Sequence, residues 1–145
     1  MGLVPNDATF KVFTGLHRAV FDVTKGRVLG RALGMTVVKL TTIGRKSGLP
    51  RDTMLTTPVH DDAKVVIVAS KGGAPRHPAW YANLRDNPQV TITMAGSRRE
   101  MVARTATAAE KAELWPAIVA AYKGYAGYQE KTDRDIPVVI LEPPA

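Results

Sequence analysis

The spacing of apolar residues along the chain predicts three helices. They span Phe10–Val23, Pro78–Asp86 and about Thr107–Lys123. The first carries apolar residues at helical spacing and its charged residues on the rest of its surface. The third opens with a capping box of Thr107 and Glu110. Because Pro116 removes a backbone N–H inside this helix, we expect a kink or a division into two helices there.

Short runs rich in β-branched residues predict six strands. They are Val37–Ile43, Asp52–Val59, Lys64–Ser70, Val90–Met94, Arg98–Thr105 and Pro137–Glu142. The run Lys64–Ser70 is apolar almost throughout, which is typical of a central strand buried on both faces. Because hairpin connections dominate, we expect an α+β fold in which an antiparallel sheet or small barrel is flanked by helices.

The composition indicates a single globular domain over residues 1–145. We expect a helix within residues 1–30, which either covers the ligand site of this domain or stays mobile. Hydrophobic residues make up 45% of the chain and charged residues 23%, close to the average for soluble domains. The chain has no cysteine, and its three histidines are not at metal-ligand spacing, so no metal site is expected. Without a signal-peptide pattern or an apolar run of about 18 residues, we expect a cytoplasmic protein.

The most informative local segment is Thr41–Arg51, TTIGRKSGLPR. It places Arg45, Lys46, Ser47 and Arg51 on one glycine-bearing loop, where backbone N–H groups can also point inward. The glycine spacing matches neither a Walker A loop nor a dinucleotide-binding turn. Several cationic donors on one loop predict a site for a ligand with several negative charges; the alternative is a solvated hairpin tip. The net charge of +7 fits an anionic ligand, nucleic acid or anionic lipid equally well.

A second cluster, SKGGAPRHPAWY at Ser70–Tyr81, follows the predicted central strand. Its paired glycines allow a ligand to approach the backbone closely. Trp80 and Asn83 could wall a flat, redox-active ring, although core packing is the alternative for Trp80. We expect His77 to be a helix cap or a surface residue rather than a catalytic base, because no carboxylate lies near it in the sequence.

Three tyrosines, Tyr122, Tyr125 and Tyr128, follow at a spacing of three with glycines between them. On one helix this spacing drifts by about 60° per step, so the rings would spiral along one side. The glycines weaken the helix and would allow a movable cover. The phenols could pack on an aromatic substrate or donate a proton; the alternative is a loose helix end whose rings close over the core.

Taken together, GRKSGLPR, VASKGGAPRHPAWYANLRDNP, the tyrosine series and TDRDIPVVILEP resemble the deazaflavin-dependent nitroreductase family, small actinobacterial oxidoreductases that use coenzyme F420. The resemblance spans roughly Leu40 to Pro143. It implies a split β-barrel similar to that of FMN-binding and pyridoxamine-phosphate-oxidase relatives. It also implies hydride transfer from the reduced cofactor to a quinone, an enone or unsaturated lactone, or a nitroaromatic, with an F420-reducing dehydrogenase as an indirect partner through the cofactor pool.

The resemblance assigns roles to individual motif residues. The cofactor-binding residues it implies are Arg45, Lys46, Ser47, Arg51, Met54, Ser70, Lys71, Gly72, Gly73, Pro78, Trp80 and Asn83. The catalytic and substrate-side residues it implies are Ser70, Tyr122, Tyr125 and Tyr128. A hydroxyl of this group would stabilise the negative charge that develops on the acceptor oxygen. The strand position that holds a tyrosine in the best-studied nitroreductase is Thr56 here, which argues against efficient activation of bulky nitroimidazole prodrugs.

Other functions stay open from the residues alone. An FMN-binding oxidoreductase would share the fold. A nucleic-acid-binding module is suggested by the net charge and by Arg98-Arg99, but an RNA-recognition signature and zinc-finger spacing are absent from the sequence. A peripheral, lipid-facing protein could use the helix Phe10–Val23, which equally suits a cover for a barrel end. We expect tight binding of coenzyme F420, weak binding of FMN and no binding of nucleic acid.

Overall fold

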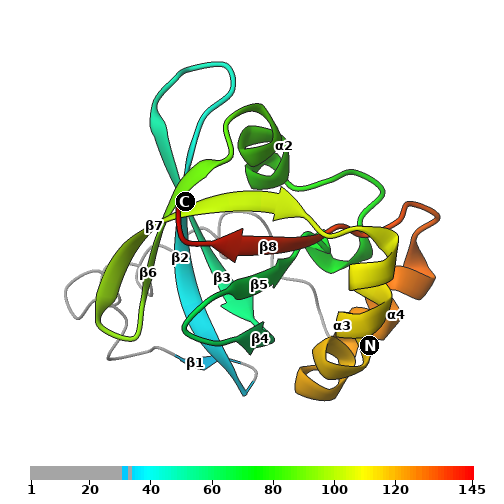
Figure 1. Ribbon diagram of the computed structural model, residues 1–145. Coiled ribbons are helices and arrows are strands. Elements are labelled where there is room, and N and C mark those ends of the chain that lie inside the picture. Colours follow the sequence, from blue (N-terminus) through cyan, green and yellow to red (C-terminus); the bar gives the residue numbers. More distant parts are fainter. Residues whose placement is uncertain (1–30, 33) are drawn as a thin grey trace.

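A computed structural model describes residues 31–32 and 34–145, which form one curled antiparallel sheet with helices around it (Figure 1). The strands are β1 (Arg31–Ala32), β2 (Met35–Ile43), β3 (Pro50–Thr57), β4 (Val59–His60), β5 (Val65–Val68), β6 (Gln89–Met94), β7 (Ser97–Thr105) and β8 (Val138–Glu142). The helices are the 3₁₀-helix η1 (Lys71–Gly73) and the α-helices α2 (Ala79–Asp86), α3 (Ala108–Ala121) and α4 (Gly124–Lys131). The predicted helix Phe10–Val23 lies outside the described residues.

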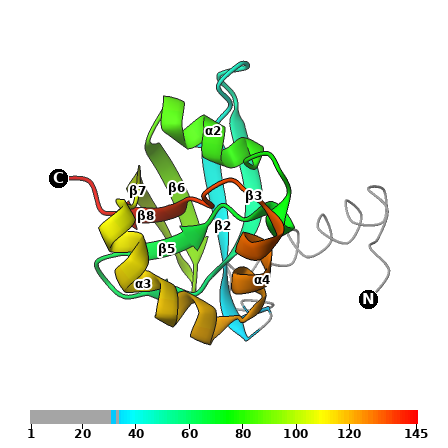
Figure 2. The ribbon, with the colours of Figure 1, turned by 90° about the vertical axis from the view of Figure 1, so that its right-hand side faces the viewer.

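The strands follow the order β1-β2-β6-β7-β8-β5-β4, and β3 pairs with β2 off this path. All pairs are antiparallel. Curling of the sheet brings β3 close to β5 without a ladder between them, so within the described residues one edge of β3 stays unpaired. The predicted antiparallel barrel with flanking helices is confirmed. Figure 2 shows α2 across one end of the sheet and α3 with α4 toward the other.

Two apolar layers hold the sheet. In β5, the odd-numbered residues of Val65–Val68 face the barrel interior, whereas the even-numbered residues face α3 and α4. This two-sided burial explains the apolar run and confirms the predicted central strand. The interior layer includes Trp80 of α2, and the outer layer includes Ile118 of α3 and Tyr125 of α4. In the described part of the chain, every helix falls short of the length and apolar character needed to cross a bilayer.

The strand predicted at Asp52–Val59 is divided into β3 and β4, and β1 was not predicted, so the described residues carry eight strands rather than six. The division falls at Pro58, which cannot donate to a ladder. The buried Thr57 side chain bridges the gap, because its hydroxyl contacts the carbonyl oxygens of Val59 at 2.9 Å and of Val66 at 2.7 Å. The chain therefore changes direction here without losing its attachment to β5.

The predicted division at Pro116 is wrong, because α3 continues through this residue to Ala121. Pro116 and Ala112, whose carbonyl it leaves without a helical partner, are both exposed, so water can bind that carbonyl. The break comes later, where α4 starts as a separate helix. The predicted capping box is confirmed by hydrogen bonds from Glu110 N to Thr107 Oγ1 at 3.2 Å and from Thr107 N to Glu110 Oε1 at 3.0 Å.

Candidate active site

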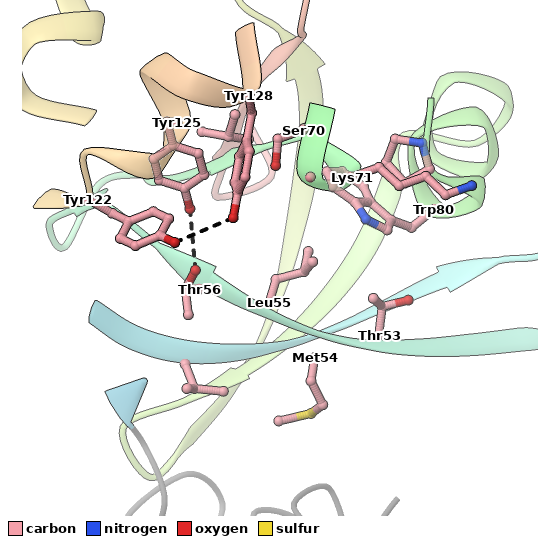
Figure 3. Close-up of a pocket in the computed structure, with 14 residues that line it drawn as sticks. Thr53, Met54, Leu55, Thr56, Ser70, Lys71, Trp80, Tyr122, Tyr125 and Tyr128 are labelled. Carbon is pink, nitrogen blue, oxygen red and sulfur yellow. Dashed lines mark hydrogen bonds between the residues drawn. The ribbon is translucent and has the colours of Figure 1, made fainter. Parts of the chain in front are cut away.

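A cavity of about 510 Å³ lies along the unpaired edge of β3. Figure 3 shows the three tyrosines and Trp80 on opposite sides of this space, with β3 beneath and Ser70 and Lys71 between them. The predicted site residues in its wall are Met54, Ser70, Lys71, Gly72, Pro78, Trp80, Tyr122, Tyr125 and Tyr128. Val37, Thr53, Leu55, Thr56 and Val68 complete the wall. Apart from Thr56, these last residues carry no functional signal in the sequence, because they look like ordinary strand positions.

The three tyrosine rings form a cluster and not the predicted spiral along one helix. Tyr122 is the C-cap of α3, whereas Tyr125 and Tyr128 belong to α4. The Tyr122 ring centroid lies 5.4 Å from that of Tyr125 and 6.2 Å from that of Tyr128. A Cβ at Gly124 would clash with Cε2 of the Tyr122 ring. Glycine at this position therefore lets the Tyr122 ring lie across the first turn of α4.

The hydroxyls of Tyr125 and Tyr128 are held in their protonated form. The hydroxyls of Tyr122 and Tyr128 share a hydrogen bond of 3.4 Å, and this bond, together with burial, raises the pKa of Tyr128 to about 12. Burial raises the pKa of Tyr125, although its 3.3 Å hydrogen bond with Thr56 opposes the shift. At neutral pH the phenols of Tyr125 and Tyr128 act as hydrogen-bond donors and not as bases.

The segment between β5 and α2 carries an unusual backbone. Lys71, Gly72 and Gly73 have φ values of 45°, 63° and 82°, so three successive residues are left-handed. Gly72 lines the cavity and has open space beside its Cα, whereas a Cβ at Gly73 would lie 2.8 Å from the backbone oxygen of Tyr128. The buried Ser70 also lines the cavity, and its hydroxyl has no hydrogen-bond partner among the described residues. Gly73 therefore packs on α4 and lines neither this cavity nor the basic one.

His77 is neither a helix cap nor a surface residue, which corrects the sequence-based expectation. Pro78 is the N-cap of α2, with no side-chain capping bond. The half-buried His77 ring lies 4.9 Å from the Tyr81 ring, and its Nδ1 lies 3.0 Å from Nη1 of Arg134. Burial lowers the pKa of His77, and the charges of Arg134 and Arg85 lower it further. The ring is therefore neutral at pH 7, so that Nδ1 accepts a hydrogen bond from Arg134.

The basic loop forms a second cavity, of about 280 Å³, between the β2–β3 hairpin and α2. The cationic and hydroxyl residues predicted to act together all line it, namely Arg45, Lys46, Ser47 and Arg51. Backbone bonds of 2.8 Å from Gly44 N to Leu49 O and from Gly48 N to Gly44 O close the turn. Figure 1 shows the hairpin projecting beyond the sheet beside α2. The predicted clustering of these side chains around one concavity is confirmed.

Two residues of α2 connect this basic cavity with the rest of the site. Asn83 accepts hydrogen bonds from Arg45 N at 3.2 Å and Arg45 Nη1 at 3.4 Å, and it donates to Thr42 Oγ1 at 3.2 Å. Asn83 therefore fixes the basic loop against α2 and lines the smaller cavity only. Trp80 is buried in the interior layer and lines both cavities. It therefore packs in the core and also forms part of the wall of the candidate site.

The other basic pair, Arg98-Arg99, follows Ser97 at the start of β7, beside the β6–β7 turn. In Figure 1 this turn lies at the opposite end of the sheet from the β2–β3 hairpin. Arg99 Nη2 contacts Asp62 O at 3.5 Å. Within the described residues the two basic groups are thus well separated and form no shared surface.

The chain is similar to a family of known proteins and to solved structures. The family model described as F420H2-dependent quinone reductase matches residues 14–143. An F420H2-dependent quinone reductase of Mycobacterium tuberculosis (strain H37Rv) is 40% identical over an alignment of 130 residues, and the match covers 87% of each chain. The solved structure of an F420-H2 dependent reductase (FDR-A) is 43% identical with a TM-score of 0.67 and covers 73% of this chain and 93% of its own.

A putative pyridoxamine 5′-phosphate oxidase from Listeria innocua shares the fold alone. Its structure is 15% identical, has a TM-score of 0.51, and covers 90% of this chain and 94% of its own. Together with the F420-H2 dependent reductase structure, this likeness confirms the predicted split barrel.

Proposed function

Because the chain belongs to the F420H2-dependent quinone reductase family, we propose that it transfers a hydride from reduced coenzyme F420 to a quinone. Enones, unsaturated lactones and nitroaromatics are further acceptors that the same chemistry would allow. The observation that carries this proposal is the pair of adjoining cavities, one mainly apolar and one basic, which share Thr53 and Trp80 as lining residues. A ligand with a flat ring at one end and several negative charges at the other would span both.

The residues present fit such a cofactor, whose deazaflavin ring continues into a phosphodiester and several carboxylates. The larger cavity offers a ring-sized space between Trp80 and the tyrosines, and Gly72 leaves the backbone accessible there. In the smaller cavity, Lys46 has no hydrogen-bond partner among the described residues, so its ammonium group is available to an anion. Arginine forks beside it suit phosphate and carboxylate groups.

The side chains of the larger cavity serve the acceptor. When bound, the reduced deazaflavin supplies the hydride. The acceptor takes up this hydride and one proton, so that a quinone becomes a quinol. The Ser70 hydroxyl stabilises the negative charge that develops on the acceptor oxygen, because it faces the cavity and is not engaged elsewhere in the described structure. The protonated hydroxyls of Tyr125 and Tyr128 orient the acceptor and help to deliver the proton, which comes ultimately from water.

Two wider expectations accompany this proposal. Residues 1–145 act as one cofactor-binding domain. After each turnover the oxidised cofactor is reduced again by a separate F420-reducing dehydrogenase, reached through the shared cofactor pool. The chain would then need no direct contact with that dehydrogenase.

A binding titration and an acceptor screen test the proposal. Fluorescence titration of the purified chain is expected to give tight binding of coenzyme F420 and weak binding of FMN. Oxidation of the reduced cofactor is then followed with menadione, cyclohexenone and a nitroaromatic, and menadione is expected to be reduced fastest. Tighter binding of FMN, or no oxidation with any acceptor, would contradict the proposed function.

The substitution Tyr125→Phe is expected to affect acceptor turnover more than cofactor affinity. The lost hydroxyl bonds to Thr56 in the wall of the larger cavity and lies outside the basic one. We expect kcat/KM for the quinone to fall about fivefold, the worth of one ordinary hydrogen bond. The matched control is Tyr81→Phe, whose hydroxyl bonds Thr105 at 2.9 Å and lines neither of these cavities. Steady-state kinetics in which both variants lose the same activity would refute this role of Tyr125.

A further inference from the structure

Arg134, which lies between α4 and β8, joins the two ends of the loop that carries Ser70. Its Nη1 donates to Ala69 O at 3.1 Å and its Nη2 donates to Ser70 O at 2.7 Å, both before the left-handed turn. Its Nε donates to Ala74 O at 2.8 Å, just after the turn. One planar guanidinium group therefore bridges the entrance and the exit of the loop.

The loop needs such a contact because its own conformation is unfavourable. Three successive residues are left-handed, and Lys71 among them carries a side chain. Within the loop only two backbone hydrogen bonds form, from Gly73 N to Ser70 O at 2.9 Å and from Ala74 N to Lys71 O at 3.1 Å. Arg134 donates three hydrogen bonds to the loop, more than the loop forms within itself. The conformation of the loop therefore depends largely on Arg134.

The same arginine is attached to the other walls of the larger cavity. Its backbone oxygen accepts a hydrogen bond of 2.8 Å from Gln129 Nε2 on α4, the helix that carries Tyr125 and Tyr128. Its Nη1 also contacts His77 Nδ1, directly before the start of α2 and Trp80. Loop, tyrosine helix and tryptophan helix thus meet at one residue, the loop and the segment before α2 at its guanidinium group and α4 at its backbone oxygen.

The chemistry of this contact favours arginine specifically. Among the described residues the guanidinium group has no carboxylate partner, since Asp135 pairs with Lys111 at 2.6 Å. Its donors go to carbonyl oxygens and a neutral imidazole nitrogen in several directions. A planar fork can satisfy these acceptors together, whereas a lysine ammonium group is a single point charge. The arrangement therefore serves geometry more than charge pairing.

We infer that Arg134 is a positioning residue that sets the distance between the Ser70–Ala74 loop and the tyrosines of α4. Arg134 lines neither cavity, so it acts through the loop and not on the reacting groups. The inference rests on the proposed function, because it assumes that Ser70 and the tyrosines act on one acceptor. Hydride transfer depends steeply on geometry, and a displacement of about 1 Å can cost a hundredfold in rate.

The test compares Arg134→Gln with Arg134→Lys, which keeps the positive charge and is the milder change. The matched control is Arg104→Lys, because Arg104 also makes several charge-assisted bonds, to Glu110 at 2.8 Å and to Glu142 at 2.7 Å, but lines neither cavity. Amide hydrogen exchange at Gly73 and Ala74 is measured by NMR on the cofactor-free chain. Single-turnover oxidation of reduced coenzyme F420 by menadione is measured at saturating concentrations.

Both Arg134 variants are expected to exchange Gly73 and Ala74 at least about tenfold faster, with β5 and β8 still protected. Both are expected to slow hydride transfer at least about tenfold, whereas Arg104→Lys does neither. Unchanged exchange, faster exchange spread over the whole sheet, or faster loop exchange with a wild-type rate of hydride transfer would each overturn the inference. A wild-type chain that fails to oxidise the reduced cofactor would instead overturn the proposed function, and that failure is visible before any variant is made.

Discussion

Replacing Lys46 or Arg51 by alanine is expected to weaken binding of coenzyme F420 by about 1.5–3 kcal/mol for each substitution, or about 10- to 150-fold in Kd. Each change removes a charged hydrogen-bond donor from the basic cavity. Arg51 has a second effect, because its Nη2 donates to Ser47 Oγ at 3.3 Å and helps to hold that hydroxyl in place.

Fluorescence titration at two salt concentrations measures this effect. The wild-type affinity is expected to fall as salt rises, because partly exposed ion pairs are screened, and the variants are expected to show a shallower salt dependence. The matched control is Arg98→Ala, which removes the same charge at the far end of the sheet and should bind like the wild type. If Lys46→Ala and Arg51→Ala also bind like the wild type, the basic cavity does not hold the cofactor.

Gly73→Ala is expected to lower the free energy of unfolding by about 2–4 kcal/mol, the sum of a left-handed backbone penalty and local overpacking. The added Cβ would lie 2.8 Å from Tyr128 O and 3.0 Å from Lys131 Cβ, and backbone cannot move aside as a flexible side chain can. Relief requires α4 to shift away from the loop. Reduction of menadione is therefore expected to fall together with stability, because Tyr125 and Tyr128 move with that helix.

The neighbouring glycine provides the matched control. Gly72 also has a positive φ, of 63°, but an added Cβ there has nothing within 4 Å. Gly72→Ala should therefore lose only the backbone component, about 1–2 kcal/mol. Urea unfolding of both variants measures the difference. Equal destabilisation would show that close packing against α4 plays no part at Gly73.

Several elements could be predicted from the sequence, because interactions between neighbouring residues determine them. The apolar run of β5 and the capping box at Thr107 depend on neighbouring residues only, and both are confirmed. The predictions of local structure were wrong where the conformation depends on a contact with a distant residue or on solvent. Pro116 does not divide α3 because water can reach the carbonyl that it leaves free. The tyrosines cluster because two helices meet at Gly124, a fact that spacing along one helix cannot reveal.

The candidate site was predictable to the extent that its residues are close in the chain. The four residues of the basic loop lie within Arg45–Arg51, so their clustering followed directly from the sequence. The wall of the larger cavity comes from several segments that are distant in the sequence. Only the family resemblance predicted that the tyrosines and Ser70 belong to one site. Arg134 belongs to the motif TDRDIPVVILEP but was assigned no role, because it stands between Asp133 and Asp135 and looks like an ordinary solvated cation. Its contact with His77, 57 residues away, exists only in the folded chain.

Trp80 stands at the partition between the two cavities, and this placement separates two kinds of selectivity. Under the proposed function, the hairpin on one side of Trp80 would decide which electron carrier is bound. Thr56 and the tyrosines on the other side would decide which oxidant can approach that carrier. Substitutions at these acceptor-side positions would therefore broaden or narrow the range of compounds that are reduced. The cofactor that binds would stay the same, because the basic cavity is unaltered.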